Sequence, residues 1–121
     1  MFDHVTLKVA DFEKSLAFYR AALAPLGLQE QALDKASKSV GFGPKGMPRL
    51  WLTEAKPRSH VHLAFESRDR DAVSRFHQRG LEAGGKDNGP PGPRADYGAN
   101  YYAAFVLDPD GNNIEAVTFA E

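Results

Sequence analysis

The sequence of 121 residues contains no cysteine. Disulfide bonds, zinc–thiolate sites and thiol nucleophiles are therefore excluded, and any metal ion must be held by His, Asp, Glu or backbone oxygen atoms. An excess of basic residues is also missing, because 15 Lys and Arg residues stand against 16 Asp and Glu residues, for a net charge of -1. A nucleic-acid-binding protein usually carries a basic stripe that neutralises phosphates, so we expect no nucleic-acid partner.

Long hydrophobic runs are absent as well. No apolar segment approaches the length of a membrane span, and Met1-Phe2-Asp3-His4 leads directly into an alternating segment without the features of a signal peptide. We expect a soluble protein with no membrane partner and with the cytoplasm as its default compartment. The hydrophobic fraction of 42% and the charged fraction of 26% are typical of globular proteins. The length predicts one domain, residues 1–121, with one core.

The first half of the chain has the pattern of a strand, a helix and three more strands. Residues 4–9 alternate between polar and apolar side chains, which predicts a half-buried strand. Asp11 is a suitable N-cap for a helix that ends before Pro25. Turn-rich stretches then separate three short strand candidates, at residues 28–33, 39–42 and 49–53. Module one, about residues 1–55, is therefore predicted to be βαβββ.

The pattern begins again in module two, about residues 60–121. The alternation of His4-Val5-Thr6-Leu7 returns in His62-Leu63-Ala64-Phe65. A second helix is expected at the same offset, because Asp69, Phe76 and Leu81 correspond to Asp11, Phe18 and Leu23. The Gly- and Pro-rich residues 88–98 are expected to form a loop, followed by strands at residues 101–107 and 113–119.

Three motifs give the chain a specific resemblance. They are His4-Val5-Thr6-Leu7-Lys8-Val9 followed by Asp11, then His62-Leu63-Ala64-Phe65, and finally the segment from Phe105 to Glu115 with its Asp108-Pro109-Asp110-Gly111 turn. In order and spacing they resemble the vicinal oxygen chelate superfamily, also called the glyoxalase/bleomycin-resistance/dioxygenase family. The resemblance implies an α+β fold in which two βαβββ modules form curved mixed sheets around a shared cup. It also implies a homodimer, and an open sheet edge that needs a partner agrees with this.

The resemblance also implies a metal site. Carried over position by position, the ligands of one divalent ion are His4, His62 and Glu115, and the fourth position falls on Trp51, whose indole cannot ligate a metal. Two imidazoles and one carboxylate can occupy one face of an octahedral ion and leave the other positions for substrate. Iron, manganese, nickel and zinc all suit such a face, so the identity of the metal stays open.

The second histidine is ambiguous, because His60 and His62 alternate onto one face of the same predicted strand. The spacing of the repeat favours His62 as the ligand, which leaves His60 as a catalytic acid or base, or as a surface residue. Tyr101 is a second candidate catalytic group, as a hydrogen-bond donor to a developing oxyanion, beside Glu115 itself.

Four further residues are candidates for substrate binding. A structural role is as well supported for Arg94 and Tyr102, and packing in the core is the better supported role for Trp51. Trp51 is a candidate wall of the pocket. Arg94 is a candidate partner for a carboxylate or phosphate, and Asn100 and Tyr102 belong to the same unusual segment.

Two functions from different classes follow from these residues. The first is a metal-dependent enzyme that chelates a small oxygenated substrate, either a glyoxalase-like lyase or isomerase or an extradiol-type dioxygenase. The second is a metal-free protein that binds and sequesters a small molecule, such as an antibiotic, as bleomycin-resistance members of the family do. The retained His and Glu residues favour the enzyme.

Overall fold

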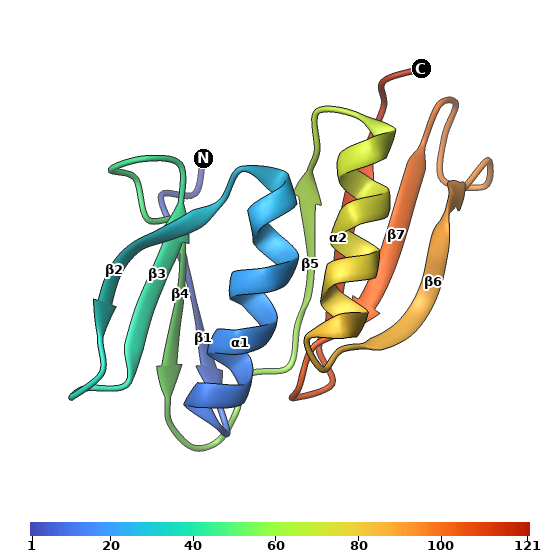
Figure 1. Ribbon diagram of the computed structural model, residues 1–121. Helices are drawn as coiled ribbons and strands as arrows, with labels where there is room; N and C mark the ends of the chain where they lie inside the picture. Colours follow the sequence, from blue (N-terminus) through green and yellow to red (C-terminus); the bar gives the residue numbers. More distant parts are fainter.

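The computed structural model describes all 121 residues. Two α-helices, two four-stranded sheets and one short 3-10 helix make up the fold (Figure 1). The helices are α1 (Phe12–Leu23), η1 (Ala24–Leu26) and α2 (Arg70–Glu82). The strands are β1 (Val5–Val9), β2 (Gln29–Asp34), β3 (Ser39–Gly43), β4 (Leu50–Glu54), β5 (His62–Glu66), β6 (Lys86–Pro93), β7 (Tyr102–Leu107) and β8 (Asn113–Thr118).

The two sheets have the same topology. The first has the strand order β1-β4-β3-β2, and the second has the order β5-β8-β7-β6. In each sheet the first strand pairs in parallel with the last strand of its module, and the other pairs are antiparallel. The fold therefore consists of two βαβββ modules, as the sequence predicts.

Both α-helices begin at the residues that the repeat predicts. The Asp11 side chain accepts a hydrogen bond from the backbone N–H of Lys14 at 3.1 Å, and that of Asp69 accepts one from Ala72 at 2.8 Å. Each carboxylate satisfies an N–H group that has no partner within its helix, which is the role of an N-cap.

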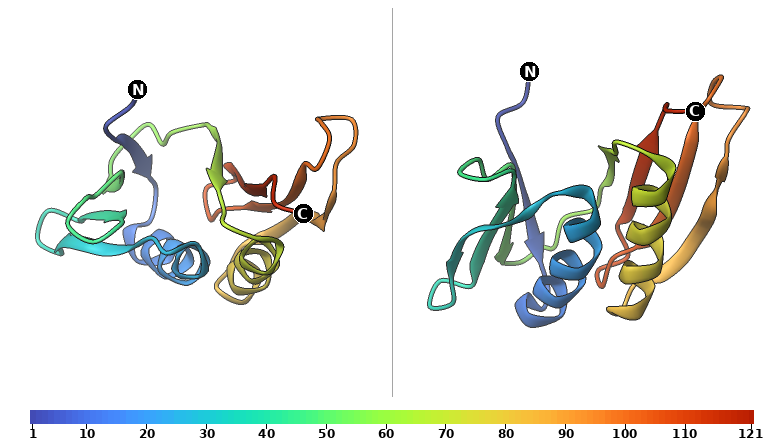
Figure 2. Two further views of the ribbon diagram at one scale, coloured as in Figure 1. Left: turned by 90° about the horizontal axis from the view of Figure 1, so that it is seen from above. Right: turned by 45° about the horizontal axis from the view of Figure 1, so that its top comes forward.

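The two helices pack against each other on the same side of the two sheets (Figures 1 and 2). Apolar side chains from both modules meet there in one continuous core, whose most buried large members are Leu7, Phe12, Phe18, Tyr19, Leu23, Phe42, Leu52, Phe76 and Ile114. Alternate residues of the strands point into this core, so the residues between them face the other way. We call the side of the sheets turned away from the helices the open face.

One predicted loop is in part a strand. The expectation of a loop over residues 88–98 is wrong for its first part, because β6 extends to Pro93 and pairs with β7. The pairing is interrupted by register shifts between Asp87 and Gly89 and between Gly89 and Gly92. A proline lacks the N–H that a central strand needs, but β6 lies at the edge of its sheet and tolerates this loss.

β1 and β5, the edge strands on the facing sides of the two sheets, run in opposite directions (Figure 1). The end of β1 therefore meets the segment that leads into β5: Lys8 and Ser59 exchange two hydrogen bonds, at 2.8 and 2.9 Å. Arg58 and the backbone N–H of Ala10 both contact Asp110 in the turn before β8. No helix of the chain is long and apolar enough to cross a membrane.

Candidate functional site

Glu115 is a buried carboxylate in the middle of β8. Its neighbours Ile114 and Ala116 belong to the core under the helices, so the Glu115 side chain points to the open face. It is nevertheless only 2% exposed. A second, smaller apolar cluster on the open face surrounds it, formed by Ala103, Phe105, Val117 and the partly buried Tyr101. A buried carboxylate needs polar partners, because the loss of water is costly for a charged group.

Two side chains supply these partners. Nε2 of His62 lies 2.8 Å from Oε1 of Glu115, and the Tyr101 hydroxyl donates a hydrogen bond to the other oxygen, Oε2. The His62 side chain is 53% exposed, so this ring joins the buried carboxylate to the solvent. Three of the residues expected at the site are therefore brought together, from β5, β8 and the residue before β7. We call them the Glu115 centre.

The same surroundings hold the Tyr101 phenol in its neutral form. Burial, the hydrogen bond to Glu115 and the negative charge of its carboxylate together raise the pKa of Tyr101 to about 12. At neutral pH the hydroxyl therefore stays a hydrogen-bond donor.

His4 does not join the Glu115 centre. Its Nδ1 lies 2.8 Å from Oδ1 of Asp3, at the far end of β1 from the contact between Lys8 and Ser59. No group of three or more His, Asp or Glu side chains in the chain is close enough to hold a metal ion. A single chain thus presents two adjacent donors of the expected three, an imidazole and a carboxylate.

Two further candidates, His60 and Trp51, form no hydrogen bond with Glu115. His60 precedes β5, is exposed and makes no side-chain hydrogen bond. Trp51 of β4 lies on the open face of the first sheet, between the buried Leu50 and Leu52. Its ring packs against Gly41, where an added Cβ would lie 3.0 Å from two ring atoms.

The three candidates around β7 have different surroundings. Arg94 lines a pocket next to Glu115. Asn100 has a φ of 62° in the turn before β7, a left-handed conformation that Asn adopts more readily than most residues. Tyr102 packs with the core on the helix side, and the Arg70 guanidinium lies 4.7 Å from the centre of its ring. The structure therefore does not bring Asn100 or Tyr102 to Glu115.

Two residues near the centre were not singled out from the sequence. The Phe105 ring lies 6.3 Å from the His62 ring, and Asn113 shares the pocket that Arg94 lines. The alternation within the predicted strands is the signal that identifies them. Phe105 lies four residues from Tyr101, and Asn113 lies two residues from Glu115, so each shares a strand face with a candidate residue.

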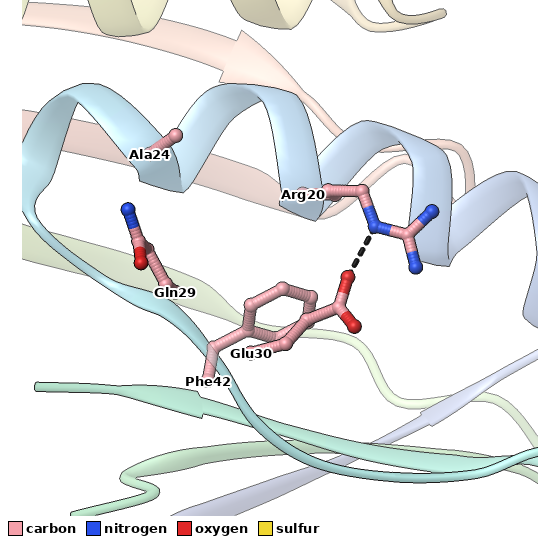
Figure 3. A pocket seen from close by; sticks show the side chains of 5 residues that line it. All are labelled: Arg20, Ala24, Gln29, Glu30 and Phe42. Carbon is pink, nitrogen blue, oxygen red and sulfur yellow. Dashed lines mark hydrogen bonds and ion pairs between the residues drawn. The ribbon is translucent and has the colours of Figure 1, made fainter. Parts of the chain in front are cut away.

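A separate shallow pocket lies on the helix side of the molecule, between α1 and β2 (Figure 3). Arg20 pairs there with Glu30, and Ala24, Gln29 and Phe42 complete the lining. Because its one charged pair is internally balanced, this pocket presents no free ionic group to a ligand.

The model of the Glyoxalase/Bleomycin resistance protein/Dioxygenase superfamily matches residues 1–116. Among solved structures, a glyoxalase/bleomycin resistance protein from Albidiferax ferrireducens T118 is similar, with 30% identity, 98% of each chain covered and a TM-score of 0.80. A glyoxalase-related enzyme from Fulvimarina pelagi has 21% identity, with 98% of this chain and 87% of that chain covered and a TM-score of 0.72. No curated protein matches the chain.

A lactoylglutathione lyase from Agrobacterium tumefaciens shares the fold at 20% identity, with 98% of this chain and 92% of that chain covered and a TM-score of 0.68. The fold, the family model and the relative at 30% identity agree. The chain belongs to the Glyoxalase/Bleomycin resistance protein/Dioxygenase superfamily. Members of this superfamily commonly use a divalent metal ion, and metal-free members also exist.

Proposed function

We propose that the chain is a metal-dependent enzyme for a small oxygenated substrate, with His62 and Glu115 as two of its metal ligands. The observation that supports this proposal is the distance of 2.8 Å between Nε2 of His62 and Oε1 of Glu115 on the open face. Imidazole nitrogen and carboxylate oxygen together suit iron, manganese, nickel and zinc. A buried carboxylate and a partly exposed imidazole at this distance are a suitable pair of ligands for a cation.

The third ligand, in this proposal, is His4 of a second copy of the chain. Within one chain His4 bonds to Asp3 and does not join His62 and Glu115, since no three His, Asp or Glu side chains lie close enough together to hold a metal ion. A twofold-symmetric dimer gives two equivalent composite sites, each with His62 and Glu115 from one copy and His4 from the other. The homodimer and the metal site are thus one hypothesis.

A bound divalent ion polarises substrate oxygens and stabilises the negative charge that develops on them. The other roles in this proposal belong to side chains of the protein. Tyr101 holds Oε2 of Glu115 and thereby fixes the direction of the carboxylate. In this proposal the single hydrogen of the Tyr101 hydroxyl, retained at neutral pH by the raised pKa, moves from Oε2 of Glu115 to a substrate oxyanion when substrate binds. Both reaction classes, a lyase or isomerase and an extradiol-type dioxygenase, agree with these roles.

A second candidate function is metal-free binding of a small molecule, of the bleomycin-resistance type. One observation favours it: both oxygens of Glu115 already have a hydrogen-bond partner in the chain, His62 on one and Tyr101 on the other. A carboxylate satisfied in this way needs no cation.

Metal analysis of protein purified without chelator separates the two functions. We expect about one ion per chain in the wild type and a loss of at least tenfold in His62→Ala and in Glu115→Ala. His77→Ala is a matched control, since Nε2 of His77 also lies 2.8 Å from a carboxylate oxygen, that of Asp87, but this carboxylate is at the surface. The control is expected to keep its metal. Near-zero metal in every variant and in the wild type would favour the metal-free function.

A further inference from the structure

A small pocket opens beside Glu115 on the open face of the second sheet. Its volume is about 230 Å³, below the roughly 300 to 1,000 Å³ of pockets for drug-sized ligands. It therefore suits a small group of atoms at one end of a molecule. We call it the Arg94 pocket, and its lining residues are Asn88, Gly89, Arg94, Tyr97, Phe105 and Asn113.

Two aromatic side chains connect this pocket to the Glu115 centre. The Phe105 ring lies 6.3 Å from the His62 ring, measured between ring centres. The Tyr97 ring lies 5.4 Å from that of Tyr101, whose hydroxyl is bonded to Glu115. A molecule with one end in the Arg94 pocket therefore reaches the Glu115 centre with its other end.

Arg94 is fixed in place by its own loop. Its Nη1 donates hydrogen bonds to the carbonyl oxygens of Gly92, at 2.9 Å, and Pro93, at 3.4 Å, while its Nη2 donates to that of Pro90 at 2.6 Å. Its Cζ lies 5.4 Å from the centre of the Phe105 ring. Neutral carbonyl groups and an aromatic face orient this guanidinium without neutralising its charge.

The positive charge of Arg94 has no counterpart in the chain. None of the ion pairs includes Arg94. Nε takes no part in its hydrogen bonds, and Nη2 uses one of its two hydrogens for Pro90. Nε and Nη2 together form the edge of a guanidinium that receives both oxygens of a carboxylate side by side. Nε of this edge has no partner in the chain, and Nη2 keeps one hydrogen beyond the one that it gives to Pro90.

Asn113 adds a second donor to the pocket. Its Oδ1 accepts a hydrogen bond from Nδ2 of Asn88 at 3.2 Å. The two hydrogens on its own Nδ2 are therefore not used in this contact with Asn88. Asn113 lies in β8, two residues before Glu115, on the open face. The pocket thus offers one cation and one neutral donor next to aromatic walls.

From these contacts we infer that the Arg94 pocket binds a carboxylate of the substrate, and that the substrate is a small, flat organic acid whose other end carries the reacting oxygens. A planar group with two oxygens matches the one guanidinium edge that remains. The aromatic walls formed by Tyr97 and Phe105 favour a flat body. This inference rests on the proposed function, because it places the substrate at the same centre.

Benzoate is the probe for this inference, and benzamide, an uncharged molecule of nearly the same shape, is the control ligand. The titration uses metal-depleted, dialysed protein, and the readout is the side-chain Nε–H signal of Arg94 in ¹⁵N-edited NMR, assigned by its loss in Arg94→Lys. We expect benzoate to shift this signal and benzamide to leave it in place. An Arg94 signal that does not move with benzoate at tens of millimolar, or that moves equally with benzamide, would overturn the inference.

Three variants complete the test. Arg94→Lys keeps the charge but loses the planar edge, and Asn113→Asp adds a negative charge without removing the loop hydrogen bonds of Arg94. Each is expected to weaken benzoate binding about tenfold or more. Arg58→Lys is the matched control, since Arg58 also donates to a backbone carbonyl, that of Asp110, outside the pocket. Unchanged affinity in both pocket variants would contradict the inference.

The readout separates this inference from the proposed function. Benzoate binding is measured without metal, and the metal content of the variants is measured without benzoate. A protein that binds metal through His62 and Glu115 but ignores benzoate contradicts the Arg94 pocket alone. A protein that binds benzoate through Arg94 but never holds metal contradicts the metal ligands alone.

Discussion

Nε2 of His62 and Oε1 of Glu115 lie 2.8 Å apart, although the two residues are 53 positions apart in the sequence. His77 and Asp87 form a pair of the same length elsewhere in the chain. The surroundings distinguish them, because the Glu115 side chain is 2% exposed and that of Asp87 is 55% exposed. A carboxylate at the surface keeps its water, whereas a buried one depends on its partners. This difference marks the first pair as the candidate centre.

The Tyr101 phenol offers a test of these surroundings. Its pKa of about 12 predicts that, in metal-depleted protein, the ¹³Cζ NMR signal of Tyr101 titrates near pH 12. Glu115→Gln removes the negative charge and is expected to lower this pKa toward the ordinary value of 10.0. Titration of Tyr101 near pH 10 in the wild type would show that the phenol is not held as described.

The raised pKa has a consequence for stability at high pH. The folded state holds the Tyr101 proton more tightly than the unfolded state, so the stabilisation is complete below about pH 10 and is lost as the pH rises to about 12. Tyr101→Phe removes this dependence. We therefore expect the wild type to lose more stability than Tyr101→Phe between these pH values in urea denaturation, and an identical loss in both would contradict the prediction.

A buried hydrogen bond connects the two modules. The Tyr19 hydroxyl of α1 donates to Oδ2 of Asp108, in the turn between β7 and β8, at 2.6 Å. Tyr19→Phe is expected to destabilise the fold by about 1–3 kcal/mol, because it leaves a buried carboxylate oxygen with one partner fewer. Tyr102→Phe is the control, since the Tyr102 hydroxyl makes no hydrogen bond within the chain, and a change within about 0.5 kcal/mol is expected. Equal effects in urea denaturation would argue against the bond between the modules.

Trp51 reports on the open face of the first sheet, since it is the only tryptophan of the chain. A Cβ at Gly41 would lie 2.9 Å from Pro48 and 3.0 Å from the Trp51 ring. Gly41→Ala is therefore expected to displace the indole, to shift its fluorescence emission and to cost about 1–3 kcal/mol of stability. Gly80→Ala in α2 is the control, because its nearest neighbours lie at 3.4 Å, an ordinary contact distance. Unchanged Trp51 emission in Gly41→Ala would contradict the packing described.

Local patterns were sufficient to predict most of the fold. Period-two alternation identifies β1 and β5, and an aspartate at the start of each helix identifies its N-cap, since these signals depend on neighbouring residues only. The strand β6 was not predicted, because its structure depends on residues that are distant in the sequence. Its prolines and glycines are typical of a loop, and its pairing depends on β7, which begins nine residues after β6 ends.

The site is predictable to a smaller extent. The alternation places Glu115 on the open face, but the position of His4 relative to His62 depends on how two modules pack, which no local pattern encodes. The free edge of Arg94 is equally hidden, because it results from hydrogen bonds to carbonyl groups of its own loop.

The central claim is a metal site shared between two copies of the chain, and mixing two inactive variants tests it most directly. His4→Ala keeps His62 and Glu115, and His62→Ala keeps His4, so neither homodimer has a complete site. A mixed dimer has one complete composite site and one that lacks both histidines. We predict that unfolding and refolding the two variants together restores metal to about one ion per mixed dimer, while each variant alone stays metal-free. Mixed dimers that hold no more metal than either variant alone would contradict the account.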